Sequence, residues 1–161
     1  MRPRKRHRLR QKEVRRIADE IERALECQVF SDSDSIDVAS LKDMDIVYVD
    51  GKVLGIIIEG QAFLSVRGLL EYVPRNRFVT VDMGAVKFVY NGADVMAPGV
   101  VDADPAISEG DLAWVRDEKN LQPLAVGVAL MSGKEMVSGN KGKAMESLHH
   151  VGDAIWKIDE D

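Results

Sequence analysis

The stretch RFVTVDMGAVKFVYNGADVMAPGVV, residues 77–101, combines extended and helical patterns and organises the second half of the chain. Its run at residues 78–81 is β-branched and aromatic, which predicts a strand. Residues 84–90 have room for about two helical turns, and the Asn-Gly pair that follows is a typical helix stop. Residues 94–96 resume an extended run before a Pro-Gly pair forces a turn. The stretch therefore predicts a strand, a short helix and a second strand.

The sequence before this stretch predicts a small α+β unit over residues 1 to about 73. An apolar stripe at helical spacing predicts a helix from Gln11, and residues 36–41 are typical of a short strand. The Asp-Gly pair inside residues 46–58 separates two β-branched runs, which predicts a hairpin. Ser65 is expected to cap a short helix.

The sequence after the stretch consists of short apolar runs separated by turns. Strands are predicted at residues 112–115 and 124–130, and again at 145–151 and 154–158. One helical turn is expected near residues 132–136. Short strands with few helices indicate a small barrel, so the predicted fold class of the whole chain is α+β.

Size and composition favour an ordinary globular protein. The chain has 161 residues, 45% of them hydrophobic, and a single cysteine, Cys27, which excludes an internal disulfide framework and fits a reducing compartment. No apolar run approaches the ~20 residues of a membrane helix, and no apolar segment of a secretory signal follows the basic N-terminus. The expected location is the cytoplasm.

The net charge of −5 hides a basic N-terminal arm, residues 1–16, that runs into the first helix. The arm holds nine of the 22 Lys and Arg but one of the 27 acidic residues, which leaves 13 basic and 26 acidic residues in the remainder. A basic arm on an acidic body is typical of nucleic-acid contact, but it is also typical of a solvated, partly disordered tail. Composition leaves both interpretations open. The arm residues considered for RNA contact are Arg2, Arg4, Lys5, Arg6, Arg8 and Arg10.

The string VDMGA followed by YNGADVMAPGV, within residues 81–100, resembles the signature of the PUA domain, an RNA-binding domain named for pseudouridine synthases and archaeosine transglycosylases. The resemblance covers residues 77–159 and implies a PUA pseudo-barrel there. Residues 1–73 resemble the pre-PUA domain of the malignant T-cell amplified sequence family and its archaeal counterparts. This family is linked to translation, and its eukaryotic members pair with density-regulated protein. The long arginine arm departs from the eukaryotic pattern.

The resemblance implies a non-catalytic RNA-binding protein that contacts tRNA or small-subunit rRNA, with a density-regulated-type translation factor as a further partner. It places the RNA face on the first short helix of the barrel, the strand after it and the last strand. The residues implicated are Val86, Lys87, Gly92, Ala93, Asp94, Val95, Met96, Lys141 and Lys143. Glycine and alanine would let a nucleic-acid backbone approach the main chain, and the lysines would contact phosphates.

The sequence contains no catalytic constellation, and neither a cofactor nor a metal site is expected. His149 and His150 are neighbours on a predicted strand, so they point to opposite faces and cannot chelate one ion together. Asp82 is expected to cap the helix that follows it rather than to act as an acid. Two other hypotheses remain: an RNA-targeting subunit of an RNA-modification enzyme, and a protein-interaction module that avoids RNA.

Overall fold

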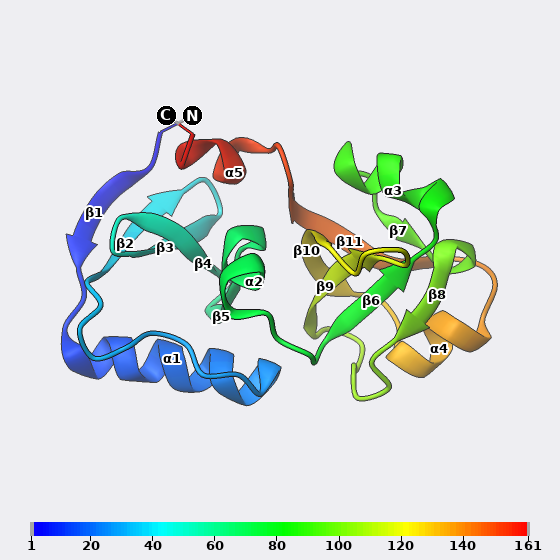
Figure 1. Cartoon of the computed structure of the whole chain (residues 1–161), viewed down its shortest axis with the longest axis horizontal. Helices are drawn as coiled ribbons and strands as arrows, with labels where there is room; N and C mark the ends of the chain where they lie inside the picture. The colour runs from blue at the N-terminus through cyan, green and yellow to red at the C-terminus, as the bar shows by residue number, and fades with distance from the viewer. Residues whose placement is uncertain (1, 161) are drawn as a thin grey trace. The chain divides into compact units, whose positions relative to one another are not determined.

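The computed structural model describes residues 2–160, which divide into two compact units (Figure 1). The first unit contains residues 2–75 and 154–160, and the second contains residues 76–153. Each unit has a sheet of its own. Among the described residues, no helix is both long enough and apolar enough to cross a membrane.

The first unit is built on a five-stranded antiparallel sheet whose strands follow one another in sequence order. The strands are β1 (Arg4–Arg8), β2 (Ile36–Leu41), β3 (Met44–Val49), β4 (Lys52–Ile58) and β5 (Gln61–Leu64). Asp50 and Gly51 join β3 to β4 with positive φ angles of 50° and 86°, as a type I′ turn requires. The predicted hairpin is confirmed.

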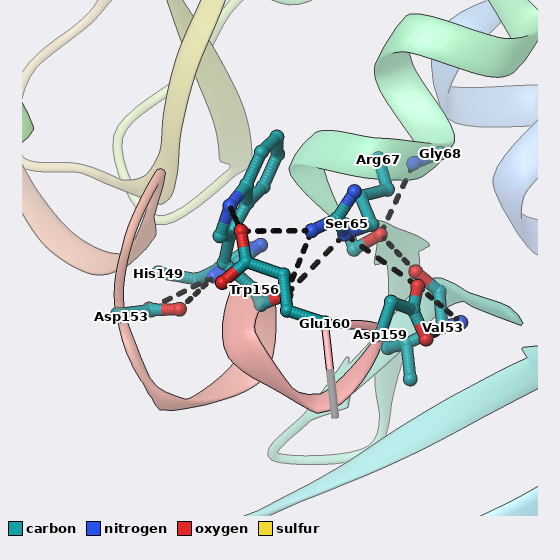
Figure 2. Close-up of polar contacts among 9 residues, drawn as sticks. All are labelled: Val53, Ser65, Arg67, Gly68, His149, Asp153, Trp156, Asp159 and Glu160. Carbon is teal, nitrogen blue, oxygen red and sulfur yellow. Dashed lines mark hydrogen bonds and ion pairs between the residues drawn. The ribbon is translucent and has the colours of Figure 1, made fainter.

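Two helices of the first unit follow the predicted patterns. Helix α1 (Gln11–Leu25) buries Ile17, Ile21 and Leu25 and packs against β5. Helix α2 (Val66–Tyr72) begins at Ser65, whose Oγ accepts the Gly68 N–H at 3.1 Å and donates to the Val53 carbonyl at 2.9 Å (Figure 2). Both predicted helices are confirmed.

The strand predicted at residues 154–158 is wrong, because these residues form helix α5 (Ala154–Ile158). Ile155 is buried and Ile158 is half-buried, a spacing of three that places both on one face of a helix but on opposite faces of a strand. The Arg67 guanidinium lies 3.8 Å from the centre of the Trp156 ring, and its Nη2 donates to the Trp156 carbonyl at 2.9 Å (Figure 2). The helical spacing and the contacts of Trp156 with Arg67 of α2 therefore both favour a helix in this segment.

The structure differs from the sequence prediction at both ends of the chain. The predicted second domain covered residues 77–159, whereas the contacts of residues 154–160 belong to the first unit. Residues 4–8 of the basic arm form the ordered strand β1, paired with β2, rather than a disordered tail. A pentapeptide of Arg, Lys and His carries no apolar–polar alternation that predicts a strand.

The second unit is built on a six-stranded sheet in the order β7-β11-β10-β9-β6-β8. Only the β6–β9 pair is parallel among the described strands of this sheet, which curves into a nearly closed barrel (Figure 1). The elements are β6 (Phe78–Val81), α3 (Met83–Tyr90), β7 (Val95–Met96), η1 (Ala97–Gly99), β8 (Val100–Ala103), β9 (Leu112–Asp117), β10 (Pro123–Ala129), α4 (Gly133–Ser138) and β11 (Lys143–His150).

Alternating side chains of the second sheet form its core. Val79 and Val81 of β6 are fully buried and pack with Ala113 and Val115 of β9. Met136 of α4 is also fully buried in this cluster. The predicted strand–helix–strand order at residues 77–101 and the α+β fold class are confirmed.

Candidate nucleic-acid interface

Helix α3 has a fixed start and a fixed end. The Asp82 Oδ1 accepts the Ala85 N–H at 2.9 Å, so Asp82 caps the helix as predicted. At the other end the Gly92 N–H donates to the Val89 carbonyl at 3.0 Å, with Gly92 at a φ of 86°. Val89 is buried and Lys87 is exposed. The helix therefore turns Lys87 toward solvent while its other side packs on the core.

The strand after α3 is joined to the last strand of the sheet. Met96 lies opposite Lys143 in the β7–β11 pair, and Val95 lies opposite Met145. The Ala97 N–H donates to the Gly142 carbonyl at 2.9 Å. This contact ties the glycine- and lysine-containing loop before β11 to the end of β7, so Met96 and Lys143 are neighbours in space.

Asp94 holds Lys143 in place. The Lys143 Nζ lies 3.2 Å from the Asp94 Oδ2, while the Asp94 Oδ1 accepts the Ser147 N–H at 2.9 Å. The hydrogen bond from Ser147 and the ammonium of Lys143 hold the pKa of Asp94 below its ordinary value. The carboxylate therefore stays ionised and orients an ammonium that is otherwise exposed.

The predicted RNA-face residues differ in their accessibility. The exposed residues are Lys87, Ala93, Met96, Lys141 and Lys143, the half-buried ones are Val86, Gly92 and Asp94, and Val95 is buried. The side chain of Val95 belongs to the core and leaves only its main chain for a ligand. A Cβ at position 92 would stand 2.9 Å from the His150 Nε2, so packing as well as the positive φ requires glycine there.

Sequence reasoning missed three apolar residues on α3. Met83, Phe88 and Tyr90 are 48%, 56% and 43% exposed, and the Lys87 Nζ lies 5.4 Å from the centre of the Phe88 ring. The signal was present, because α3 is apolar on more sides than one core can bury. Exposed aromatic rings beside a lysine offer both stacking surface and charge.

The predicted arm residues lie in the other unit. The Asp37 carboxylate of β2 pairs with both Arg6 and Arg8, which lowers the pKa of Asp37. Arg4 and Lys5 are exposed and form no ion pair within residues 2–160. The basic arm is therefore a separate, ordered cationic surface.

The two adjacent histidines have different surroundings. His149 is 1% exposed, and its Nδ1 lies 2.9 Å from the Asp153 Oδ2 (Figure 2). His150 instead places its Nδ1 2.9 Å from the Val151 carbonyl oxygen. Within residues 2–160 there is no cluster of three or more His, Cys, Asp or Glu that could hold a metal ion. His149 is therefore a buried residue of β11, whereas His150 is half-buried.

Comparison with known proteins accounts for this architecture. Residues 77–151 match the PUA domain family, and residues 5–67 match a domain of unknown function (DUF1947). An uncharacterized protein of Methanocaldococcus jannaschii is 42% identical over 157 residues, which cover 96% of this chain and 97% of that protein. The chain belongs to the family of PUA-domain proteins that begin with a DUF1947 domain. The first unit is hereafter the DUF1947 domain and the second the PUA domain.

Eukaryotic proteins are also similar to this chain, and the yeast relative carries a name from translation. Translation machinery-associated protein 20 of Saccharomyces cerevisiae is 33% identical over 116 residues, 68% of this chain and 64% of the yeast protein. Malignant T-cell-amplified sequence 1-B of Xenopus laevis is 34% identical over 104 residues, 62% of this chain and 57% of that protein. The chain thus spans less than two thirds of these relatives. The predicted resemblance to this family is confirmed.

A solved structure agrees along the whole chain. The crystal structure of a hypothetical protein from Pyrococcus horikoshii has a TM-score of 0.84 at 38% identity and covers 96% of this chain and 99% of its own. The predicted order, an α+β domain followed by a PUA barrel, is therefore that of a known two-domain architecture.

Proposed function

We propose that this protein is a non-catalytic RNA-binding protein of translation, which contacts tRNA or small-subunit rRNA through its PUA domain. The PUA domain is an RNA-binding module, and relatives of the chain are named for the translation machinery. The observation that carries the proposal is the surface formed by α3, β7 and β11. Lys87 of α3, Lys141 of the loop before β11 and Lys143 of β11 are all exposed, and Gly92 and Ala93 after α3 have almost no side chain.

The chemistry of this surface suits an RNA end more than a duplex. Lys87, Lys141 and Lys143 supply ammonium groups for phosphates, whose attraction depends on salt rather than on sequence. Met96, 46% exposed, lies next to Lys143 and offers an apolar surface to an unpaired base. Ala93 is exposed and small, so an RNA backbone can approach main-chain groups closely.

Asp94 limits non-specific attraction at this surface. Its carboxylate offsets the charge of Lys143 while leaving the ammonium exposed, with 59% of the lysine side chain accessible. A phosphate bound to Lys143 therefore has to fit beside Asp94 rather than approach from any direction. A site whose positive charge is largely offset should therefore distinguish RNAs by their shape more than by their charge.

Further RNA contacts, a protein partner and a cellular location are proposed as well. The basic strand of the DUF1947 domain adds affinity for RNA, a density-regulated-type translation factor is the proposed protein partner, and the cytoplasm is the proposed location. A relative named as a translation machinery-associated protein supports a place in translation, and the exposed cations of β1 support the added affinity. Co-sedimentation of the protein with small ribosomal subunits in cell extract is the expected result, and its absence from all ribosomal fractions would contradict this part.

Two double variants of equal charge change test the interface. Lys87→Glu with Lys141→Glu reverses two exposed charges on the proposed face, and Lys119→Glu with Lys134→Glu does so elsewhere in the PUA domain. The first double variant is expected to bind tRNA at least roughly tenfold more weakly in fluorescence anisotropy, since two phosphate contacts become repulsive. The control is expected to stay within about threefold. If both double variants lost tRNA affinity equally, the loss would be explained by net charge alone and the proposed interface would be wrong.

A further inference from the structure

A groove on the DUF1947 domain lies beside the basic strand β1. It encloses about 580 Å³ and is lined by residues of β1, β3, β4, α2 and α5, among them Arg6, Tyr48, Arg67 and Leu70. Its size is within the usual range for a bound small molecule or one nucleotide. The groove is distinct from the α3 surface, because its lining residues all belong to the DUF1947 domain.

An arginine–tyrosine stack forms part of the groove. The Arg6 guanidinium lies 3.8 Å from the centre of the Tyr48 ring, and 47% of the Arg6 side chain is exposed. Asp37 fixes the guanidinium by accepting a hydrogen bond from Arg6 Nε at 2.9 Å. One face of the planar group covers the ring, so the other face is left for a second flat partner such as a nucleobase.

Tyr48 brings an unused hydrogen-bonding group to the same groove. The residue is only 5% exposed, yet its hydroxyl forms no hydrogen bond within residues 2–160. Burial raises the pKa of Tyr48, so the hydroxyl remains a neutral donor. Among the described residues the buried side-chain polar atom without a hydrogen-bond partner is the Ser147 Oγ, so the Tyr48 hydroxyl meets solvent in the groove and can donate to a ligand there.

The charges around the groove favour an anionic chain over a neutral ligand. Lys52 lines the groove and forms no ion pair within the described residues, and Arg4 and Lys5 continue the cationic surface along β1. Of the two lining carboxylates, Asp159 accepts the Val53 N–H at 3.0 Å and lies 3.5 Å from the Arg67 Nε (Figure 2). Its charge is therefore balanced, which leaves Glu71 as an acceptor for a base amino group or a ribose hydroxyl.

We infer that the DUF1947 domain carries a second RNA site, in which β1 contacts the phosphates of a single strand and one unpaired base stacks on Arg6 within the groove. The Tyr48 hydroxyl hydrogen-bonds this base, and Lys52 contacts a neighbouring phosphate. A row of cations beside a stacking platform is the general arrangement of single-strand binding sites. The site rests on the proposed RNA-binding function but not on the α3 surface.

An abasic oligonucleotide separates base contact from phosphate contact. Anisotropy titrations of the full chain would compare a 12-nucleotide oligouridine with an abasic ribose-phosphate chain of equal length. The wild type is expected to bind oligouridine roughly tenfold more tightly than the abasic chain, as one stacked base contributes on this scale. Arg6→Lys keeps the charge but removes the planar group, so the preference should fall about fivefold, and Tyr48→Phe should lower it about threefold.

Three comparisons make the result decisive. Arg23→Lys, a matched change at an exposed arginine of α1, should leave the preference unchanged. Unaltered binding of the abasic chain by Arg6→Lys would show that β1 is still in place. Unchanged preferences in both Arg6→Lys and Tyr48→Phe would overturn the second site. If the preference falls only in the Lys87→Glu, Lys141→Glu variant, the second site is wrong and the proposed function of the PUA domain stands.

Discussion

The two cationic surfaces of this protein are built in opposite ways. Strand β1 displays four Lys and Arg residues against one acidic partner, Asp37, so its charge dominates. The PUA surface combines three lysines with Asp94, a small residue and exposed apolar side chains. A surface that attracts phosphates by charge alone binds any RNA, and salt weakens that binding. A surface whose charge is partly offset and whose shape fits one RNA can distinguish between RNAs. We therefore expect the first surface to provide affinity and the second to provide selectivity.

The scaffolds beneath the two surfaces contain glycines in close contact with backbone, and changing one such glycine in each domain gives the largest expected effects. A Cβ at Gly68 would lie 2.0 Å from the Leu54 carbonyl oxygen, and one at Gly127 would lie 2.1 Å from the Glu146 carbonyl oxygen. Either glycine-to-alanine change should cost at least about 3 kcal/mol, since backbone must move. Hydrogen exchange should locate the loss in the DUF1947 domain for Gly68→Ala and in the PUA domain for Gly127→Ala.

The control for these variants is Gly110→Ala, because a Cβ there meets nothing within 4 Å. Its φ of 92° still makes alanine unfavourable, so a loss of about 1 kcal/mol is expected. If Gly127→Ala were no more damaging than Gly110→Ala, close packing of β10 on β11 would not explain the glycine.

The C-terminal helix gives the next largest effect. Arg67→Ala removes the stack on Trp156, the hydrogen bonds to its carbonyl and the ion pair with Asp159. We expect α5 to detach locally, at a cost of about 2 kcal/mol, with faster hydrogen exchange at residues 154–158. Arg75→Ala, at an exposed arginine, is the control. Unchanged exchange in α5 after Arg67→Ala would show that other contacts hold the helix.

The Asp94–Lys143 pair is expected to make the stability of the PUA domain depend on pH. Because the pKa of Asp94 is lowered in the folded protein, its contribution to stability is present above the ordinary value of about 4 and is lost as pH falls toward the folded pKa. Asp94→Asn should cost about 1–2 kcal/mol at pH 7, and the difference from wild type should shrink below about pH 4. Urea unfolding at pH 7 and pH 3 measures both. A constant difference at the two pH values would contradict the ionised pair.

The smallest expected effect is a difference in salt dependence between Lys141, in the loop before β11, and Lys143, the first residue of β11. Lys141 forms no ion pair within residues 2–160, whereas Lys143 is paired with Asp94. If both contact phosphates, Lys141→Ala should lower the slope of log affinity against log salt by about 0.7 to 0.9. Lys143→Ala should lower it less, since Asp94 already offsets that charge. Anisotropy titrations of each variant at four salt concentrations give both slopes. If the two variants lowered the slope equally, the proposed role of Asp94 would be wrong.

The sequence predicted the structure correctly where the local pattern and the packing favour the same conformation. The Asp50-Gly51 turn, the Asp82 cap and the Ser65 cap all follow from residues close in the chain. Sequence prediction failed where a distant partner decides the structure, because β1 has no apolar residue and depends on pairing with β2, and α5 is held by Arg67. The Asp94–Lys143 pair joins residues 49 positions apart, so spacing alone could not reveal it.

The measurement that tests the central claim most directly is an anisotropy titration of the full chain against tRNA with and without its 3′ CCA end, at two salt concentrations. Selection by the PUA surface predicts tighter binding of the CCA-bearing tRNA, with a preference that survives at the higher salt. The Lys87→Glu, Lys141→Glu variant should lose that preference. Equal and strongly salt-dependent binding of both tRNAs by the wild type would contradict the account and assign the affinity to the basic strand alone.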